Sequence, residues 1–414
     1  MRVILVIAAL VGLFLSLLGG CGGDTPSTAD NGQTQETPEA IVTIKIGNIT
    51  DLTGAGASGM ELVNVALEDM ASYYNDNNLI PGVQFEVLHW DSQLDPNKTI
   101  PGYEWLRHRN VDFLVTCVPV VASTLRPRLE ADEMALFTHS GELGTVEPPG
   151  YVFSMQSIPQ HDAYTFLNWI AENDWDYANN GPAKIGGAAW AEPYASAFFQ
   201  ATEEYARAHP DQFKYKGGYL TDFKFSWDSE IDVLKECDYI YPPIIMHEFA
   251  KDLRNVGSEA KLIGGNAHTA FFEQVSDAKA WPAIDGMLFV FGGAWWTEPL
   301  EEVEFNKMIL NTYHPGKEEE ITGRSGYGAM TSLRMLFDII EKTVEDTGPQ
   351  GFDSVALNET AQSWSYSWDY RPRGYSFTQT KRYMPNDLCI QEASAEIETL
   401  SRKDPNWYPI LTKP

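Results

Sequence analysis

Two consecutive series of alternating strand-like and helix-like segments constrain this fold more than any other feature. Residues 41–138 begin with an alternating apolar–polar stretch, place apolar residues at helical spacing over 60–75, and continue in this order to a fourth strand. The same order restarts over residues 162–291. Strands that alternate with helices predict a parallel sheet with helices on both faces. The sequence therefore predicts an α/β fold of two doubly wound parallel-sheet lobes.

The length and charge of the chain agree with two lobes and exclude one class of partner. The chain has 414 residues, which suggests two domains that each bury a core. Its formal net charge is −29 at pH 7, and such a surface repels nucleic-acid phosphates. We therefore expect no nucleic-acid partner.

The first residues read as an export signal. An apolar run over residues 3–18 is shorter than the ~20 residues of a membrane-spanning helix and ends in Leu18-Gly19-Gly20-Cys21. This ending resembles the bacterial lipobox, which implies a lipoprotein signal peptide over 1–20 and a lipid on Cys21. The alternatives are a plain signal peptide or an uncleaved anchor. Residues 21–40 are rich in Gly, Ser, Thr, Pro, Asp and Gln, which predicts a flexible tether.

Three cysteines remain after Cys21. Cys117, Cys237 and Cys389 allow at most one disulfide, and no metal-binding spacing such as C-x-x-C is present. We interpret them as three small buried hydrophobic residues and expect no metal site.

Several short motifs occur in an order that resembles one family. Ile44-Lys45-Ile46-Gly47 precedes Asp51-Leu52-Thr53-Gly54, and the later motifs are Asp91-Ser92-Gln93-Leu94-Asp95-Pro96, Trp190-Ala191-Glu192-Pro193-Tyr194 and Leu262-Ile263-Gly264-Gly265. This series is similar to the leucine/isoleucine/valine-type solute-binding proteins of ABC transporters, the type 1 periplasmic binding proteins. The resemblance implies two lobes joined by three crossovers, hinge closure on a ligand, no catalytic residue and no cofactor.

The resemblance also suggests where each lobe begins and ends. We expect the first lobe over 41–158 and 290–345 and the second over 159–289 and 346–390. Residues 391–414 match least well and are expected to form a C-terminal extension.

Candidate ligand-binding residues follow from the resemblance, position by position. The family binds a ligand carboxylate at the start of a first-lobe helix and at a second first-lobe turn. Other family contacts come from the first turn of the chain, from the second lobe and from an interlobe segment. The positions here are Ser58, Ala122, Ser123, Ser140, Gly141, Glu142, Trp190, Tyr194, Asn266 and Trp296.

Two of these positions argue against an α-amino acid as the ligand. Glu142 would repel a carboxylate, and Asn266 stands near the place of an acid that pairs with the ammonium group. Alternatives remain open: Ser123 could only cap its helix, Glu142 could be an exposed loop residue outside the pocket, and each Trp taken alone favours packing.

A glycine-rich motif resembles a cofactor loop but lacks its context. Residues 54–59 match G-x-G-x-x-G, yet the acid expected ~20 residues on is absent. Gly323-Arg324-Ser325-Gly326-Tyr327 fails G-x-S-x-G at its last position.

The sequence therefore predicts a lipid-anchored receptor on the extracytoplasmic side of the membrane. It would capture a small molecule and deliver it to an ABC permease. Two alternatives remain, namely a sensor that signals to a membrane partner and an α/β hydrolase.

Overall fold

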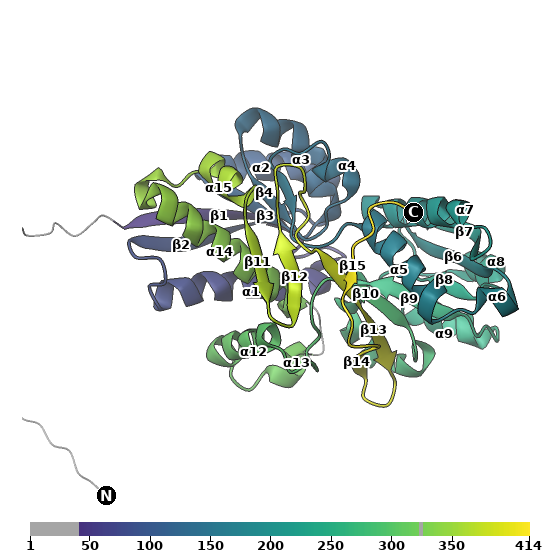
Figure 1. Cartoon of the computed structure of the whole chain (residues 1–414). Helices are drawn as coiled ribbons and strands as arrows, with labels where there is room; N and C mark the ends of the chain where they lie inside the picture. The colour runs from purple at the N-terminus through teal and green to yellow at the C-terminus, as the bar shows by residue number, and fades with distance from the viewer. Residues whose placement is uncertain (1–40, 323–325) are drawn as a thin grey trace, which may run out of the picture. The chain divides into compact units, whose positions relative to one another are not determined.

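The computed structural model describes residues 41–322 and 326–414 (Figure 1). The expected signal peptide over 1–20, the lipid-bearing Cys21 and the tether over 21–40 lie outside these residues. Within the described ranges, no helix combines the length and the apolar character of a membrane span. Cys117, Cys237 and Cys389 are free thiols, of which the last two are buried.

The first lobe is built on a five-stranded parallel sheet with the order β2-β1-β3-β4-β5. Its strands are β1 (Val42–Thr50), β2 (Val83–Asp91), β3 (Phe113–Thr116), β4 (Leu136–Thr138) and β5 (Val152–Ser154). The connecting segments form α1 (Ala57–Asp76), η1 (Pro96–Lys98), α2 (Thr99–Arg107), α3 (Pro119–Asp132) and α4 (Leu143–Val146).

Both faces of this sheet are buried, because successive side chains of a strand point to opposite faces. In β3, Phe113 and Val115 belong to the apolar cluster that contains residues of α1. Leu114 belongs to the opposite cluster, which contains Leu106 of α2 and Leu125 of α3. The apolar residues of β3 therefore pack into two hydrophobic cores, one on each face of the sheet.

The second lobe is built on a larger, mixed sheet with the order β14-β13-β10-β9-β8-β6-β7. Five parallel strands form its main part: β6 (Ala183–Trp190), β7 (Phe213–Thr221), β8 (Tyr239–Tyr241), β9 (Lys261–Gly265) and β10 (Leu288–Phe291). Three antiparallel strands complete it: β13 (Asp387–Ser394), β14 (Thr399–Arg402) and β15 (Tyr408–Pro409). Its helical segments are α5 (Pro159–Asn173), α6 (Tyr177–Asn180), α7 (Pro193–Ala208), α8 (Asp228–Leu234), α9 (His247–Asn255), α10 (Asn266–Thr269), α11 (Phe272–Asp277) and η2 (Trp281–Ala283).

The chain passes between the two sheets three times, as the predicted fold class requires. The first crossover runs from β5 to α5, and the second runs from β10 to α12 (Glu301–Tyr313). The third runs from α15 (Ser354–Ala361) to β13 and contains the hairpin of β11 (Ser365–Trp368) and β12 (Arg371–Ser376). Between the second and third crossovers lie α13 (Glu318–Thr322), η3 (Gly326–Ala329), α14 (Met330–Thr347) and η4 (Pro349–Gly351).

The lobe boundaries near the C-terminus differ from the expected ones. Residues 346–390 were expected in the second lobe, but α15 packs against α14 beside the first sheet, where Ser354 Oγ accepts a hydrogen bond from the Ala135 N–H at 2.6 Å. Residues 391–414 were expected as an extension, but they contain β14 and β15. The buried Leu400 of β14 explains this difference, because its side chain is covered only when the strand joins the sheet.

A buried arginine joins the second and third crossovers. Arg371 is completely buried, and its Nε lies 2.5 Å from Asp387 Oδ1. Its Nη1 donates to the Gly292 carbonyl at 2.8 Å, and its guanidinium lies 4.2 Å from the Tyr375 ring centroid. We call Arg371, Asp387, Gly292 and Tyr375 the crossover network.

We expect Arg371→Met to destabilise the protein by about 3–5 kcal/mol, because it leaves the buried Asp387 carboxylate without its cation. The free energy of unfolding in guanidinium chloride measures this change. Arg373→Met is the matched control, since the Arg373 side chain is half exposed and lies 3.9 Å from the same carboxylate. Equal stability losses in the two variants would contradict the structural role of Arg371.

Candidate functional site

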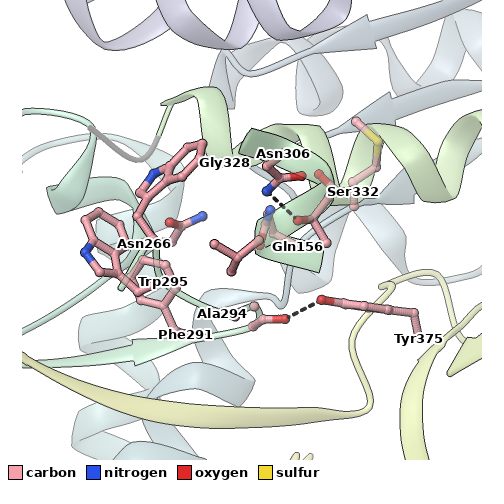
Figure 2. A pocket seen from close by; sticks show the side chains of 15 residues that line it. Gln156, Asn266, Phe291, Ala294, Trp295, Asn306, Gly328, Ser332 and Tyr375 are labelled. Atoms are coloured by element: carbon pink, nitrogen blue, oxygen red, sulfur yellow. Dashed lines mark hydrogen bonds between the residues drawn. The ribbon is translucent and has the colours of Figure 1, made fainter. Parts of the chain in front are cut away.

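A pocket lies where the three crossovers run beside one another (Figure 2). The first crossover contributes Met155 and Gln156, the second contributes residues 292–296, and the third contributes Tyr375. The first lobe adds Asn306 of α12 and Thr331 of α14, while the second lobe adds Asn266 at the end of β9. Because both lobes contribute to one pocket, a molecule bound there would contact both.

Aromatic side chains form one side of this pocket. Phe291, Trp295, Trp296 and Tyr375 line it, and each is at least nine-tenths buried. The hydroxyl of Tyr375 donates to the Gly292 carbonyl at 3.0 Å, which holds the ring in place (Figure 2). Such rings offer a large apolar contact surface at a small cost in side-chain entropy.

Amides and hydroxyls supply the polar groups of the lining. Asn306 Nδ2 donates to Thr331 Oγ1 at 3.0 Å, while Asn306 Oδ1 is buried without a hydrogen-bond partner (Figure 2). Ser332 Oγ donates to the Ala329 carbonyl at 2.9 Å and also lies 3.0 Å from His139 Nε2. A buried carbonyl oxygen without a donor costs free energy, so Asn306 has one acceptor that a ligand could satisfy.

No described residue that lines the pocket carries a formal charge. Three ionisable groups lie behind the lining. Burial lowers the pKa of His139 to about 4, which keeps its ring neutral at pH 7, and burial raises the pKa of Glu302 to about 7. Arg371 is already paired with Asp387. At pH 7 the His139 ring is therefore neutral, the Glu302 carboxyl group is close to half ionised, and the Arg371 charge is compensated.

One helix end adds a partial positive charge. Thr331 and Ser332 lie in the first turn of α14, where a helix dipole favours an anion by about 0.3–1 kcal/mol, and by up to ~2 kcal/mol in partly buried sites. Burying an ionised group without a counter-charge costs several kcal/mol. The balance therefore favours neutral polar groups in this pocket.

Two of the ten predicted ligand positions line the pocket, namely Asn266 and Trp296. Of the others, Ser58 lies at the start of α1, where its Oγ accepts a hydrogen bond from Gln274 Nε2 of α11 at 2.9 Å. This bond joins the first lobe to the second.

Two further predicted residues have roles inside α3. Ala122 is completely buried, and its cluster is the core that contains Leu125 and Leu129 of the same helix. Ser123 Oγ donates to the Val120 carbonyl at 3.2 Å, within the first turn. Neither residue lines the pocket.

The turn after β4 also lies outside the pocket lining. Ser140 Oγ donates to the Cys117 carbonyl at 2.7 Å, and a Cβ on Gly141 would lie 2.7 Å from the Ser154 Cβ. The carboxylate of Glu142 accepts the Gly144 N–H at 2.6 Å and caps α4. This geometry agrees with the interpretation of Glu142 as a loop residue outside the pocket.

Trp190 is the last residue of β6 and Tyr194 lies in the first turn of α7, both in the second lobe. Trp190 Nε1 donates to the Lys224 carbonyl at 2.8 Å, and its ring centroid lies 4.6 Å from that of Phe223. Tyr194 donates its hydroxyl proton to Asp162 Oδ2 at 2.9 Å. Both side chains therefore have protein partners rather than a place in the pocket lining.

The glycine-rich loop after β1 binds a carboxylate of its own chain. The N–H groups of Gly54 and Gly56 donate to the two oxygens of Asp51, at 2.6 and 2.8 Å. A dinucleotide phosphate would need these same amides. The loop geometry thus supports the exclusion of a dinucleotide site.

Sequence reasoning missed most of the polar lining. Gln156 lies in a crossover, Asn306 lies on α12, and Thr331 and Ser332 lie on α14; none of them was predicted as a site residue. One signal was present in the sequence: Asn306 and Ser332 occupy buried faces of α12 and α14 among apolar residues. Polar residues on an apolar helix face are candidates for a site.

Comparisons with known proteins agree with this architecture. Residues 43–208 match a family model described as periplasmic binding protein. A search of curated proteins finds no match.

Solved structures resemble this chain over most of its length. A branched-chain amino acid ABC transporter from Thermus thermophilus with bound valine has a TM-score of 0.76 and 15% identity, and the match covers 90% of this chain and 97% of that one. A fatty acid ABC transporter substrate-binding protein from Thermomonospora curvata has a TM-score of 0.74 and 17% identity, with coverages of 90% and 94%. An ABC transporter solute-binding protein from R. palustris in complex with benzoate has a TM-score of 0.69 and 15% identity, with coverages of 89% and 97%. The chain therefore has the type 1 periplasmic binding protein fold.

Asp162 should make the stability of the protein depend on pH. Burial raises the pKa of Asp162 to about 7, so the folded state holds a proton that the unfolded state releases near pH 4. The contribution of this group to stability is complete below about pH 4 and is lost as the pH rises through about 7. We expect a loss of up to about 4 kcal/mol over this window, since each pKa unit is worth about 1.4 kcal/mol.

Denaturation curves of the protein and of Asp162→Asn, recorded from pH 4 to 8, test this expectation. The stability difference between the two should shift in favour of the variant as the pH rises. Asp211→Asn, at an exposed position, controls for the loss of one carboxyl group. Parallel curves for the protein and Asp162→Asn would contradict the assignment.

Proposed function

We propose that this chain is an extracytoplasmic solute-binding receptor that captures a small organic molecule between its lobes and delivers it to an ABC importer. One observation carries the proposal: the pocket is lined by both lobes and by all three crossovers. Structures with the same fold are described as an ABC transporter with bound valine and a solute-binding protein in complex with benzoate. Asn266 lines the pocket near the place where the resemblance implies an acid for a ligand ammonium group, and this argues against a standard α-amino acid as the ligand.

The proposed mechanism is binding coupled to closure of the lobes. A ligand that contacts Asn266 from the second lobe and Thr331 from the first would stabilise the closed form relative to the open form. The lobes already touch near the start of α1, where a Cβ on Gly59 would lie 2.8 Å from the ring of Phe271. The importer would then recognise the surface that closure creates.

We propose no catalytic role for the pocket. Ser332 Oγ lies as close to His139 Nε2 as a nucleophile lies to its general base. The Ser332 hydroxyl, however, donates its hydrogen bond to the Ala329 carbonyl and not to the His139 ring. The other ring nitrogen of His139, Nδ1, is buried without a hydrogen-bond partner, so no carboxylate orients the ring. The arrangement supports binding rather than hydrolysis.

A thermal-shift screen of small organic solutes tests the proposed receptor function. A ligand present at 100 times its Kd should stabilise the folded state by about 2.7 kcal/mol and raise the Tm. Gln156→Ala should reduce that shift, because Gln156 lines the pocket. Gln200→Ala, at an exposed position of α7, should retain the full shift. A screen in which no solute class raises the Tm would contradict the proposal.

The proposal includes a lipid anchor on Cys21, which would keep the receptor at the membrane surface beside its permease. Cells that produce the protein and are fed radiolabelled palmitate should label it, and Cys21→Ala should abolish the label and leave the precursor uncleaved. Cys117→Ala is the matched control and should be labelled normally. Label on Cys21→Ala would overturn the anchor.

A further inference from the structure

We infer that the pocket accepts an uncharged molecule that both donates and accepts hydrogen bonds, and that it discriminates against carboxylate and ammonium groups. This inference rests on the proposed receptor function and specifies the class of ligand. It differs from the chemistry of valine and benzoate, the ligands named for two of the solved structures, because both of these molecules carry ionised groups at neutral pH.

A donor–acceptor pair in the first lobe gives the inference its geometric basis. Thr331 Oγ1 already accepts a hydrogen bond from Asn306 Nδ2, so the Thr331 hydroxyl can donate its own hydrogen bond to a ligand. Asn306 Oδ1 is buried without a hydrogen-bond partner and can accept a hydrogen bond from a ligand. The ligand must therefore offer an acceptor beside a donor.

Two further lining residues have the same dual character. Gln156 of the first crossover and Asn266 of the second lobe are carboxamides, each with two donor protons and one acceptor oxygen. A carboxylate offers only acceptors, and an ammonium group offers only donors. A carboxamide or a pair of neighbouring sugar hydroxyls offers both, and these two sources share the required chemistry.

The electrostatics of the pocket agree with this assignment. A carboxylate in the pocket would find no cationic side chain among the described lining residues, and an ammonium group would find no carboxylate there. Arg371 approaches the lining through the Gly292 carbonyl and through the ring and hydroxyl of Tyr375, and its charge is paired with Asp387. The partial charge at the start of α14 suits the oxygen of a neutral amide or hydroxyl.

The aromatic side of the pocket adds a preference for flat molecules. The rings of Phe291 and Trp295 contact each other edge to face, with their centroids 5.6 Å apart, and Trp296 and Tyr375 also line the pocket. A planar ring or the apolar face of a sugar would lie against these rings. Aromatic carboxamides and monosaccharides therefore represent the two sources in an experiment.

Isothermal titration calorimetry of the purified full chain with matched probes tests the inference. The first arm compares benzamide with benzoate and benzylamine, and nicotinamide with nicotinate. The second arm uses ribose, arabinose and glucose. We expect the neutral member of at least one aromatic set to bind at least about tenfold more tightly than its charged partners, or one sugar to bind.

The outcomes separate this inference from the receptor function. A charged probe that binds as tightly as its neutral partner, or more tightly, overturns the inference and leaves the receptor function standing. Binding of no probe overturns the inference, and the thermal-shift screen decides the receptor function independently. The arm that responds identifies the source, carboxamide or sugar.

A charge-introducing variant tests the same point from the protein side. Asn266→Asp adds a carboxylate of nearly equal size to the lining. It should weaken the affinity for the neutral probe at least about tenfold and raise the affinity for benzylamine relative to that for benzamide. Asn180→Asp adds the same charge at an exposed position outside the lining and should leave both affinities unchanged. A ratio that is the same in both variants would overturn the inference, and thermal unfolding of Asn266→Asp verifies that it remains folded.

Discussion

The guanidinium of Arg371 sits where the second and third crossovers meet, and the arrangement of the two lobes depends on it. The guanidinium is completely buried, so its charge is stable there only because Asp387 neutralises it and backbone carbonyl groups accept its other hydrogen bonds. These partners come from different segments, because Gly292 follows β10 while Asp387 begins β13. The network therefore ties the second crossover to the third through buried polar contacts.

The crossover network also shapes the pocket. The Gly292 carbonyl accepts hydrogen bonds from both Arg371 and Tyr375, and the Tyr375 ring held in this way lines the pocket. The compensated charges therefore remain behind the lining, while amides, hydroxyls and aromatic rings face the space inside. This separation explains how a chain with a strongly negative net charge can present a pocket lining without formal charge.

The fold could be predicted from the sequence because both of its sheets depend on local patterns. Apolar runs such as Phe113–Thr116 and helical spacing over 60–75 follow directly from burial on one or two faces. The C-terminal region could not be assigned in this way. Strand β13 pairs antiparallel with β10, which lies far earlier in the sequence, and β14 joins the sheet only through its pairing with β13. Only the completed sheet therefore shows that both strands belong to the second lobe.

The pocket was harder to predict for the same physical reason. Asn266 and Trp296 follow the ends of strands, where ligand contacts are expected in open α/β sheets, and both line the pocket. Gln156, Asn306 and Thr331 come from a crossover and two helices that meet only in the folded chain. Tyr194, by contrast, lies in the first turn of α7 shortly after β6, but its hydroxyl donates a hydrogen bond to the buried Asp162.

Closure of two lobes on one solute is the central claim, and an interlobe distance tests it most directly. Leu52 after β1 and Phe223 after β7 are exposed positions on different lobes, which suit cysteine substitution and spin labels. The account predicts that a solute which raises the Tm shifts the distance distribution to a single, shorter population. An identical distribution with and without a solute that demonstrably binds would contradict it.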